Sequence, residues 1–332
     1  MKNSRRRVPD ALALISVSLS LLLPFVSHGL AQTGSTSVIG MFPKQMIDFA
    51  YADLKETPKY PWFNYMRQQL MPDRFKQFDQ FLGSIGLDMV SHLQDFYWGT
   101  VAISGGSQQI VGVATGEFDL ASTEDHLKSE QLPSFDFHGY KLYAFGGGDS
   151  PRDILFTFID SSTIAFGQRD AVEALIDVRT GAADGLFSND KIFPYINDAS
   201  GTGLIWSVLG PETARQTLQD LVADIGQVPQ ITTISGKLKA MTISVQADGD
   251  DGMRLGFQTI CDSPDDANLL SAAIEAGLLY QRYRTSGSNS ALAELFGQAR
   301  VMPRGERLEA SFSLDKDELE ALALNGNFLR AF

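Results

Sequence analysis

Apolar and polar residues alternate along two long stretches of the chain, which is the pattern of β-strands with one buried face. In the first stretch, residues 98–119 contain two such runs about a Gly-Gly-Ser turn at 105–107. In the second, residues 239–262 contain two runs about an Asp- and Gly-rich turn at 248–252. Because Gly and Asp readily adopt the positive φ angles of hairpin turns, both stretches predict antiparallel β-hairpins.

Helical spacing of apolar residues occurs before and between the hairpins. One helix is expected to begin at Pro72, because proline is favoured in the first helical turn, and to turn one apolar face toward the core. Another is expected to begin at Ser263 and Pro264, with the serine as its cap. The predicted core face of the first helix consists of Phe75, Phe78, Phe81, Leu82 and Ile85.

The order strand, strand, helix, strands, helix occurs twice along the chain. Aligning the two hairpins places Asp119 on Asp262, an offset of 143 residues, and aligning two later helices places Ala174 on Ala321, an offset of 147. These offsets predict an internal duplication of about 145 residues. Antiparallel hairpins that alternate with helices predict an α+β fold of two repeated modules, each an antiparallel sheet covered by helices.

Four segments follow from this pattern. Residues 1–31 are expected to form a signal peptide, and residues 38–98 a helical N-terminal segment that packs on the first module. The first α+β module is expected over residues 99–228 and the second over residues 229–332. The roughly 300 residues after the signal are enough for two medium domains or one large duplicated domain.

The first thirty residues have the layout of a secretory signal. Arginines at positions 5–7 precede an uncharged, leucine-rich run at residues 11–26, which Pro24 interrupts. Cleavage is expected after Ala31, with cleavage after Gly29 as the alternative. A retained anchor is the competing interpretation, but a spanning helix needs roughly 20 apolar residues and this run is shorter. The sequence therefore predicts an exported protein, periplasmic or secreted, without a stable membrane anchor after cleavage.

Loss of the signal makes an acidic chain more acidic. Residues 1–31 carry four positive charges and one negative charge, so the formal net charge changes from −13 to −16. Such a surface repels nucleic acid and anionic lipid headgroups, and we expect neither as a partner. The arginines also partly match a twin-arginine export signal, but Pro9 and Asp10 follow them, which favours the general secretory route.

Five segments carry local motifs that mark the ends of predicted strands. They are FPKQMIDFAYADL, GSIGLDMVSHLQDFYWG, VGVATGEFDL, FHGYKLYAF and STIAFGQRDAVEALIDVRTG. In their Gly-x-Asp, Gly-x-Phe-Asp and Phe-Gly motifs, the chain resembles a group of uncharacterised exported bacterial proteins over residues 40–325. The resemblance implies export and this fold, and it carries over no activity and no catalytic residue.

Two serines match part of a catalytic pattern. Ser188 and Ser313 each begin an S-x-x-K sequence, and Tyr195 begins a Y-x-N sequence, as in penicillin-recognising enzymes. The spacing argues against catalysis, because Ser188 and Tyr195 are only seven residues apart and no K-T-G follows. No G-x-S-x-G elbow occurs either. We expect both serines to cap the helices that follow them.

Two histidines offer a metal-site hypothesis. His126 and His138 lie twelve residues apart with Asp125 and Asp136 beside them, so two imidazoles and two carboxylates could bind zinc. Their polar surroundings favour ordinary solvated side chains instead. The sequence therefore predicts no metal site.

The remaining motifs have structural explanations. The turn at 248–252 lacks the alternating ligands of a calcium loop, and the glycine run at 146–148 lacks the Lys-Ser/Thr of a phosphate loop. Cys261 is the only cysteine and lies in an apolar strand, so we expect a buried inert thiol and no disulfide. Several aromatic residues could line a groove, but core packing is favoured for Tyr60, Trp62, Phe63, Tyr65, Trp98 and Trp206.

The functional hypothesis rests on these exclusions and on the repeat. The sequence predicts a non-catalytic exported protein that binds or scaffolds an envelope component, either a protein or another ligand, with no catalytic residue and no cofactor. One alternative is a hydrolase of unfamiliar type, because the spacing of paired carboxylates in space is not visible in a sequence. The other alternative is a carrier of an apolar ligand.

Overall fold

A computed structural model describes residues 36–64, 73–84, 92–145, 150, 153–223, 234–287, 290–315 and 318. The predicted signal peptide, its cleavage site at Ala31 and the glycine run at 146–148 lie outside these residues. The strands of the described part are β1 (Asp48–Asp53), β2 (Leu93–Ala102), β3 (Gln108–Gly116), β4 (Ser134–Phe137), β5 (Tyr140–Phe145), β6 (Ile154–Asp160), β7 (Thr163–Gly167), β8 (Ile205–Leu209), β9 (Leu238–Asp248), β10 (Gly252–Cys261), β11 (Arg300–Arg304) and β12 (Arg307–Leu314).

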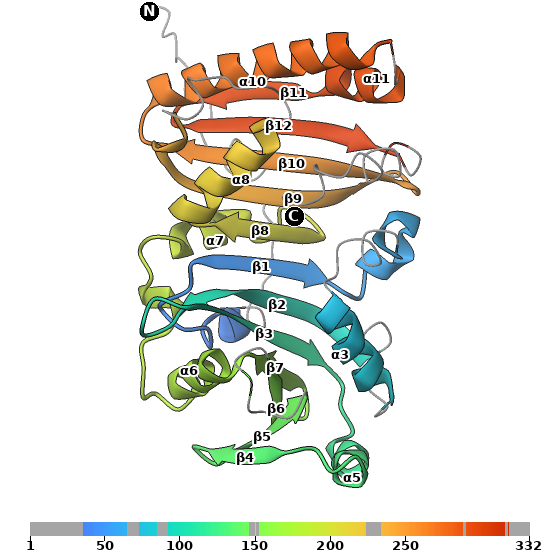
Figure 1. Cartoon of the computed structure of the whole chain (residues 1–332), viewed down its shortest axis with the longest axis vertical. Coiled ribbons are helices and arrows are strands. Elements are labelled where there is room, and N and C mark those ends of the chain that lie inside the picture. The colour runs from blue at the N-terminus through green and yellow to red at the C-terminus, as the bar shows by residue number, and fades with distance from the viewer. Residues whose placement is uncertain are drawn as a thin grey trace, which may run out of the picture.

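These twelve strands form one antiparallel sheet in the order β11-β12-β10-β9-β8-β1-β2-β3-β7-β6-β5-β4 (Figure 1). The predicted α+β class is confirmed, and the antiparallel strands of the two expected modules lie in a continuous sheet. The long axis of the molecule runs across the strands, so β11 and β4 lie at opposite ends (Figure 1).

The two halves of the sheet meet at the pair formed by β1 and β8. Tyr51 lies opposite Trp206, and Ala52 lies opposite Ile205. Outward from this pair, one half has the order β1-β2-β3-β7-β6 and the other has the order β8-β9-β10-β12-β11. The strand order is therefore mirrored about the centre of the sheet, and β5 and β4 extend one half only.

Strand β1 lies in the segment that the sequence predicts as helical. Within residues 38–98, residues 48–53 are extended, and β2 begins at Leu93, five residues before the expected change of pattern. Phe49 and Tyr51 point to one side of β1 and the alanines to the other. Six residues bounded by irregular chain make a short pattern, and the partner strand β8 is some 150 residues away, so nothing nearby in the sequence marks this strand.

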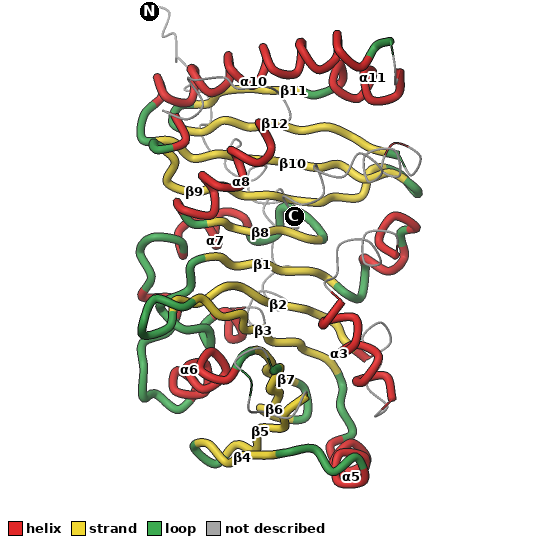
Figure 2. Tube along the Cα trace, in the orientation of Figure 1, coloured by secondary structure: helices red, strands yellow, loops and turns green. Residues whose placement is uncertain are grey.

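Helices cover both faces of the sheet (Figure 2). The clusters of buried side chains separate them into two groups, according to the sheet face that each helix contacts. On the face that carries Ala52, Phe166 and Leu255 lie α3 (Asp73–Ser84), η1 (Thr57–Lys59), α5 (Leu120–Ser129), α8 (Pro211–Ala223), α10 (Pro264–Thr285) and α11 (Ser290–Gln298). On the opposite face lie α6 (Arg169–Arg179), η2 (Leu186–Ser188) and α7 (Phe193–Ala199).

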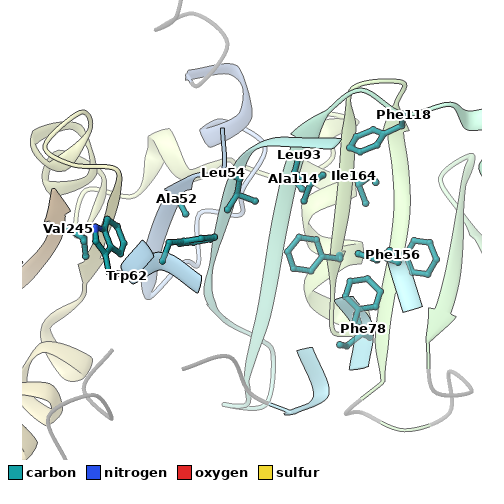
Figure 3. Packing of buried hydrophobic residues seen from close by; sticks show 14 of the residues in the cluster. Ala52, Leu54, Trp62, Phe78, Leu93, Ala114, Phe118, Phe156, Ile164 and Val245 are labelled. Carbon is teal, nitrogen blue, oxygen red and sulfur yellow. The ribbon is translucent and has the colours of Figure 1, made fainter. Parts of the chain in front are cut away.

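The largest core cluster joins the two halves of the molecule. Helix α3 places Phe78 against Phe156 of β6, with ring centroids 5.8 Å apart. In the same cluster, Trp62 lies beside Ala52 of β1 and Val245 of β9 (Figure 3). The predicted core face of α3 is confirmed for Phe78, Phe81 and Leu82, while Ile85 and the Phe75 side chain lie outside the described residues.

The predicted hairpin turns are confirmed. Gly105 and Gly106 between β2 and β3 have φ angles of +90° and +81°, and Gly249 between β9 and β10 has a φ angle of +72°. These left-handed conformations are open to glycine at no steric cost. The acidic turn at 248–252 therefore reverses the chain, as expected from its composition.

Candidate functional site

Helix α10 has strong local signals at both ends. Ser263 caps it, because its hydroxyl accepts a hydrogen bond from the Asp266 backbone N–H at 3.2 Å, and Pro264 occupies the first turn. Acidic residues lie in its first turn and basic residues, including Arg284, in its last, which complements the helix dipole. Its 22 residues extend over roughly 33 Å. The cap at Ser263 is as the sequence predicts.

The inner side of α10 packs on the end of the sheet. Ala267, Leu270 and Ala273 are buried in a cluster with residues of α8, β9 and β10. The helix also lies against β11, β12 and α11, at the end of the molecule that β11 forms (Figure 1). Gly277 and Gln281 are buried on the same side. The packing fixes which face of α10 points outward.

The outward face of α10 is apolar. Leu269, Leu279, Tyr280 and Tyr283 are 57%, 65%, 52% and 83% exposed. Exposed alanines lie between them on the same face, at a spacing of three and four residues that keeps side chains in line along a helix. We call this face the outer stripe, and its members are Leu269, Ala272, Ala276, Leu279, Tyr280 and Tyr283.

The outer stripe concentrates the apolar surface of the described residues. Four of their seven exposed large hydrophobic side chains belong to it, and the other three, Ile110, Phe187 and Met302, come from separate elements. Scattered apolar residues are normal on a protein surface, whereas a contiguous patch marks an interaction site. The stripe is therefore the candidate functional site.

Sequence reasoning did not single out this face. The available signal was the distribution of apolar residues around the helix, which covers both the buried and the outward sides of α10. A helix with one solvent face normally shows a single apolar stripe about 100° wide. Two apolar sides on one helix indicate two contacts, and the sheet accounts for only one.

A second polar cluster lies at the end of β1 and β2, on the opposite face of the sheet. The Tyr51 hydroxyl donates to Asp95 Oδ1 at 2.8 Å, and the Thr115 hydroxyl donates to Asp95 Oδ2 at 3.0 Å. Tyr51 packs between Tyr97 and Trp206, with ring centroids 5.0 and 5.5 Å away. Burial and the neighbouring Asp95 carboxylate raise the pKa of both Tyr51 and Tyr97 well above 10.

Asp53 lies opposite Asp95 in the strand register, so two carboxylates are adjacent here. Burial, together with the Asp95 charge, raises the pKa of Asp53. Asp53 Oδ1 accepts hydrogen bonds from the backbone N–H groups of Lys55 and Glu56, at 3.0 and 2.8 Å. Each carboxylate is thus engaged in bonds that fix a strand end, and the phenol beside them stays protonated. The arrangement supports a structural role.

The two histidines of the metal-site hypothesis have different surroundings. His138 lies 3.2 Å from the Asp177 carboxylate of α6, and His126 lies on α5. Over the residues that the structure describes, no group of three or more histidine, cysteine or acidic side chains could hold a metal ion.

The expected capping roles of Ser188 and Ser313 are wrong. Ser188 ends the short helix η2, and Asn189 makes the capping bonds instead, because its Oδ1 accepts from the Lys191 and Ile192 backbone N–H groups at 3.0 and 3.2 Å. Ser313 lies within β12, where its hydroxyl donates to Asp248. Asn189 and the strand register were the competing features. The two serines therefore lie on separate elements.

Cys261 and the aromatic residues lie where the sequence predicts. Cys261 is buried and unpaired, and burial raises its pKa to about 11, which keeps the thiol neutral. Trp62, Phe63 and Trp206 are buried, and Tyr60 and Trp98 pack against the core, while Tyr65 lies outside the described residues. Trp206 faces the opposite side of the sheet from the others, so these rings do not line a common groove.

Fold and site together define an α+β protein with one continuous antiparallel sheet and an exposed apolar helix at one end. The fold is similar to that of TP0453, a protein of Treponema pallidum: its crystal form I matches with a TM-score of 0.50 and 12% identity, over 86% of this chain and 96% of that one. Crystal form IV matches with a TM-score of 0.48 and 10% identity, over 86% and 95%. At such identity the likeness concerns the fold alone. No family model and no curated protein matches the sequence.

Proposed function

We propose that the protein is a non-catalytic binding or scaffolding protein of the bacterial envelope, and that it binds through the outer stripe of α10. The observation that carries this proposal is the exposure of Leu269, Leu279, Tyr280 and Tyr283 on one rigid helix. Leaving four large apolar side chains in water forgoes about 1.5–3 kcal/mol for each of them, and contact with a partner would recover much of that free energy. Aromatic side chains are also enriched among residues that dominate binding.

The predicted signal at residues 1–31 supports the envelope part of the proposal. Its basic head and apolar run match an export signal, and the mature chain that results has a formal net charge of −16. Among the helices that the structure describes, none is long and apolar enough to span a bilayer. We therefore place the protein in the periplasm or outside the cell.

The polar cluster at Asp53 and Asp95 favours binding over hydrolysis as the function. A glycosidase needs one carboxyl group free to give a proton and the other free to attack or to activate water. Here Asp95 already accepts from Tyr51 and Thr115, and Asp53 accepts from two backbone N–H groups.

Site-specific photo-crosslinking in exporting cells tests the proposal. A photoreactive residue replacing Tyr283 should form a protein adduct of defined mass, whereas the same residue replacing Ala182, which is exposed after α6, should not. The adduct should be lost when Leu279→Glu is added. Equal results at the two positions would contradict the proposal. So would turnover of an esterase, glycosidase or peptidase substrate by the purified protein, if Asp95→Asn abolished that turnover without unfolding the chain.

A further inference from the structure

We propose that the partner on the outer stripe is a second copy of this chain, packed against the first through antiparallel α10 helices. The inference rests on the proposed function, because it identifies the occupant of the same surface. A two-fold dimer uses one patch twice, so the patch must be complementary to itself when reversed. Both the sizes and the charges along α10 meet this requirement.

The sizes of the side chains are complementary about Ala276. In an antiparallel pair centred on this residue, Leu269 and Tyr283 lie seven residues to either side and therefore face each other across the contact. Ala272 and Tyr280 lie four residues to either side, so the large ring meets a small partner. Ala276 meets Ala276 of the other copy, which lets the helices approach closely. Such alternation of large and small side chains is what allows helices to interdigitate.

The charges at the ends of α10 are complementary in the same arrangement. Asp265 lies at the beginning of the helix and Arg284 at its end, and both are exposed. Reversal about Ala276 brings Arg284 to the level of residue 268 in the other copy, about 5 Å along the axis from Asp265. An arginine side chain spans that separation. Both ends of the contact then pair an acid with a base, whereas parallel helices would place like charges together.

The same charges disfavour a lipid surface as the occupant. Helices that lie on a membrane carry lysine and arginine beside their apolar face. The first turn of α10 carries Asp265 and Asp266 instead, and Glu275 is exposed near its centre. The outer stripe extends over about 21 Å, so its area is at the lower end of specific interfaces. We therefore expect a reversible dimer that forms with increasing concentration.

Cysteine cross-linking tests the geometry of the dimer in the full chain. With helix axes 8–10 Å apart and Cα atoms about 2.3 Å from each axis, the two Ala276 Cα atoms would lie roughly 5 Å apart. A disulfide spans that distance. Under mild oxidation, Ala276→Cys should give a covalent dimer in most of the protein, while Ala182→Cys should give at least tenfold less. Cys261 is buried and provides no background.

Charge exchange tests whether the partner is this chain. Arg284→Asp alone and Asp265→Arg alone should each weaken the dimer at least fivefold in sedimentation equilibrium, because each homodimer then pairs like charges. An equimolar mixture of the two variants should restore dimer formation, because the mixed pair has opposite charges at both ends. Failure of the mixture to associate more strongly than either variant would overturn the antiparallel arrangement.

The cellular adduct separates this inference from the function on which it rests. An adduct at Tyr283 with twice the mass of the chain supports the second copy. An adduct with a different protein, from a chain that sediments as a monomer, overturns the second copy and leaves the binding function intact. No adduct at all contradicts both. Stripe-dependent flotation with phosphatidylethanolamine and phosphatidylglycerol vesicles, abolished by Leu279→Glu, would overturn the second copy in favour of lipid.

Discussion

Individual side chains at the Tyr51 and Asp95 cluster connect the fold to alkaline pH. Both Tyr51 and Tyr97 have pKa values raised above the ordinary value of about 10, with burial as the main cause and Asp95 as the next. In the unfolded chain these phenols ionise near pH 10, whereas in the folded protein they keep their protons to higher pH. The folded state therefore binds more protons above pH 10, and stability falls as pH rises through that range.

Tyr51→Phe should make the folded protein less sensitive to alkali. A phenol that ionises only on unfolding contributes about 1.4 kcal/mol of lost stability per pH unit above 10, and the variant removes one such group. At neutral pH the same variant should lose about 1 kcal/mol, because the hydrogen bond to Asp95 is removed. Urea unfolding between pH 7 and pH 11 measures both effects. Tyr283→Phe, which removes a phenol that is 83% exposed, is the control, and an unchanged slope in Tyr51→Phe would contradict the account.

At the scale of elements, one glycine in a strand is required by its neighbour. A Cβ atom added to Gly112 of β3 would lie 2.1 Å from Cζ of Phe166, which lies directly opposite on β7. The Phe166 ring cannot easily move, because it stacks on Phe96 with centroids 5.2 Å apart and is 4% exposed. The aromatic ring thus covers the glycine backbone, and the two residues act as one packing unit.

Gly112→Ala should destabilise the protein by about 2–3 kcal/mol, since overpacking of a rigid core has that magnitude. Gly83→Ala is the matched comparison, because Gly83 lies near the end of α3 with nothing within 4 Å of the added atom. It should be stabilising by about 0.5–1 kcal/mol, because alanine favours a helix over glycine. Urea denaturation of both variants measures the difference. Equal effects would show that Phe166 does not restrict Gly112.

The elements that the sequence predicts well are those with complete local signals. The hairpins at 105–107 and 248–252 have turn residues with positive φ, and α10 begins with a serine cap and a proline. The elements it predicts poorly depend on distant partners. Strand β1 pairs with β8 across more than 150 residues, and the role of Ser313 follows from its pairing beside Asp248. The outer stripe was equally hidden, because burial of one side of α10 is decided by the sheet.

At the scale of the whole molecule, the proposed duplication and the continuous sheet have different consequences. The mirrored strand order about β1 and β8 supports two related halves, and the spacing of the predicted repeats supports a division near residue 229. Two independent domains would each have a core of their own. Instead, the largest cluster combines Ala52 and Phe78 with Val245 and Leu255, so side chains of both halves share one core.

We expect this shared core to make the chain unfold as one unit. If β1 and β8 separate, both halves expose apolar surface at once, so neither half retains its stability alone. Urea unfolding monitored by tryptophan fluorescence, which reports on Trp62, Trp98 and Trp206, should coincide with unfolding monitored by circular dichroism over the whole chain. Two separated transitions would show that residues 99–228 and 229–332 are independent domains. A single transition that moves to lower urea in both probes with Val245→Ala, by about 1 kcal/mol or more of stability, would place the joint between the halves at the centre of the cooperative unit.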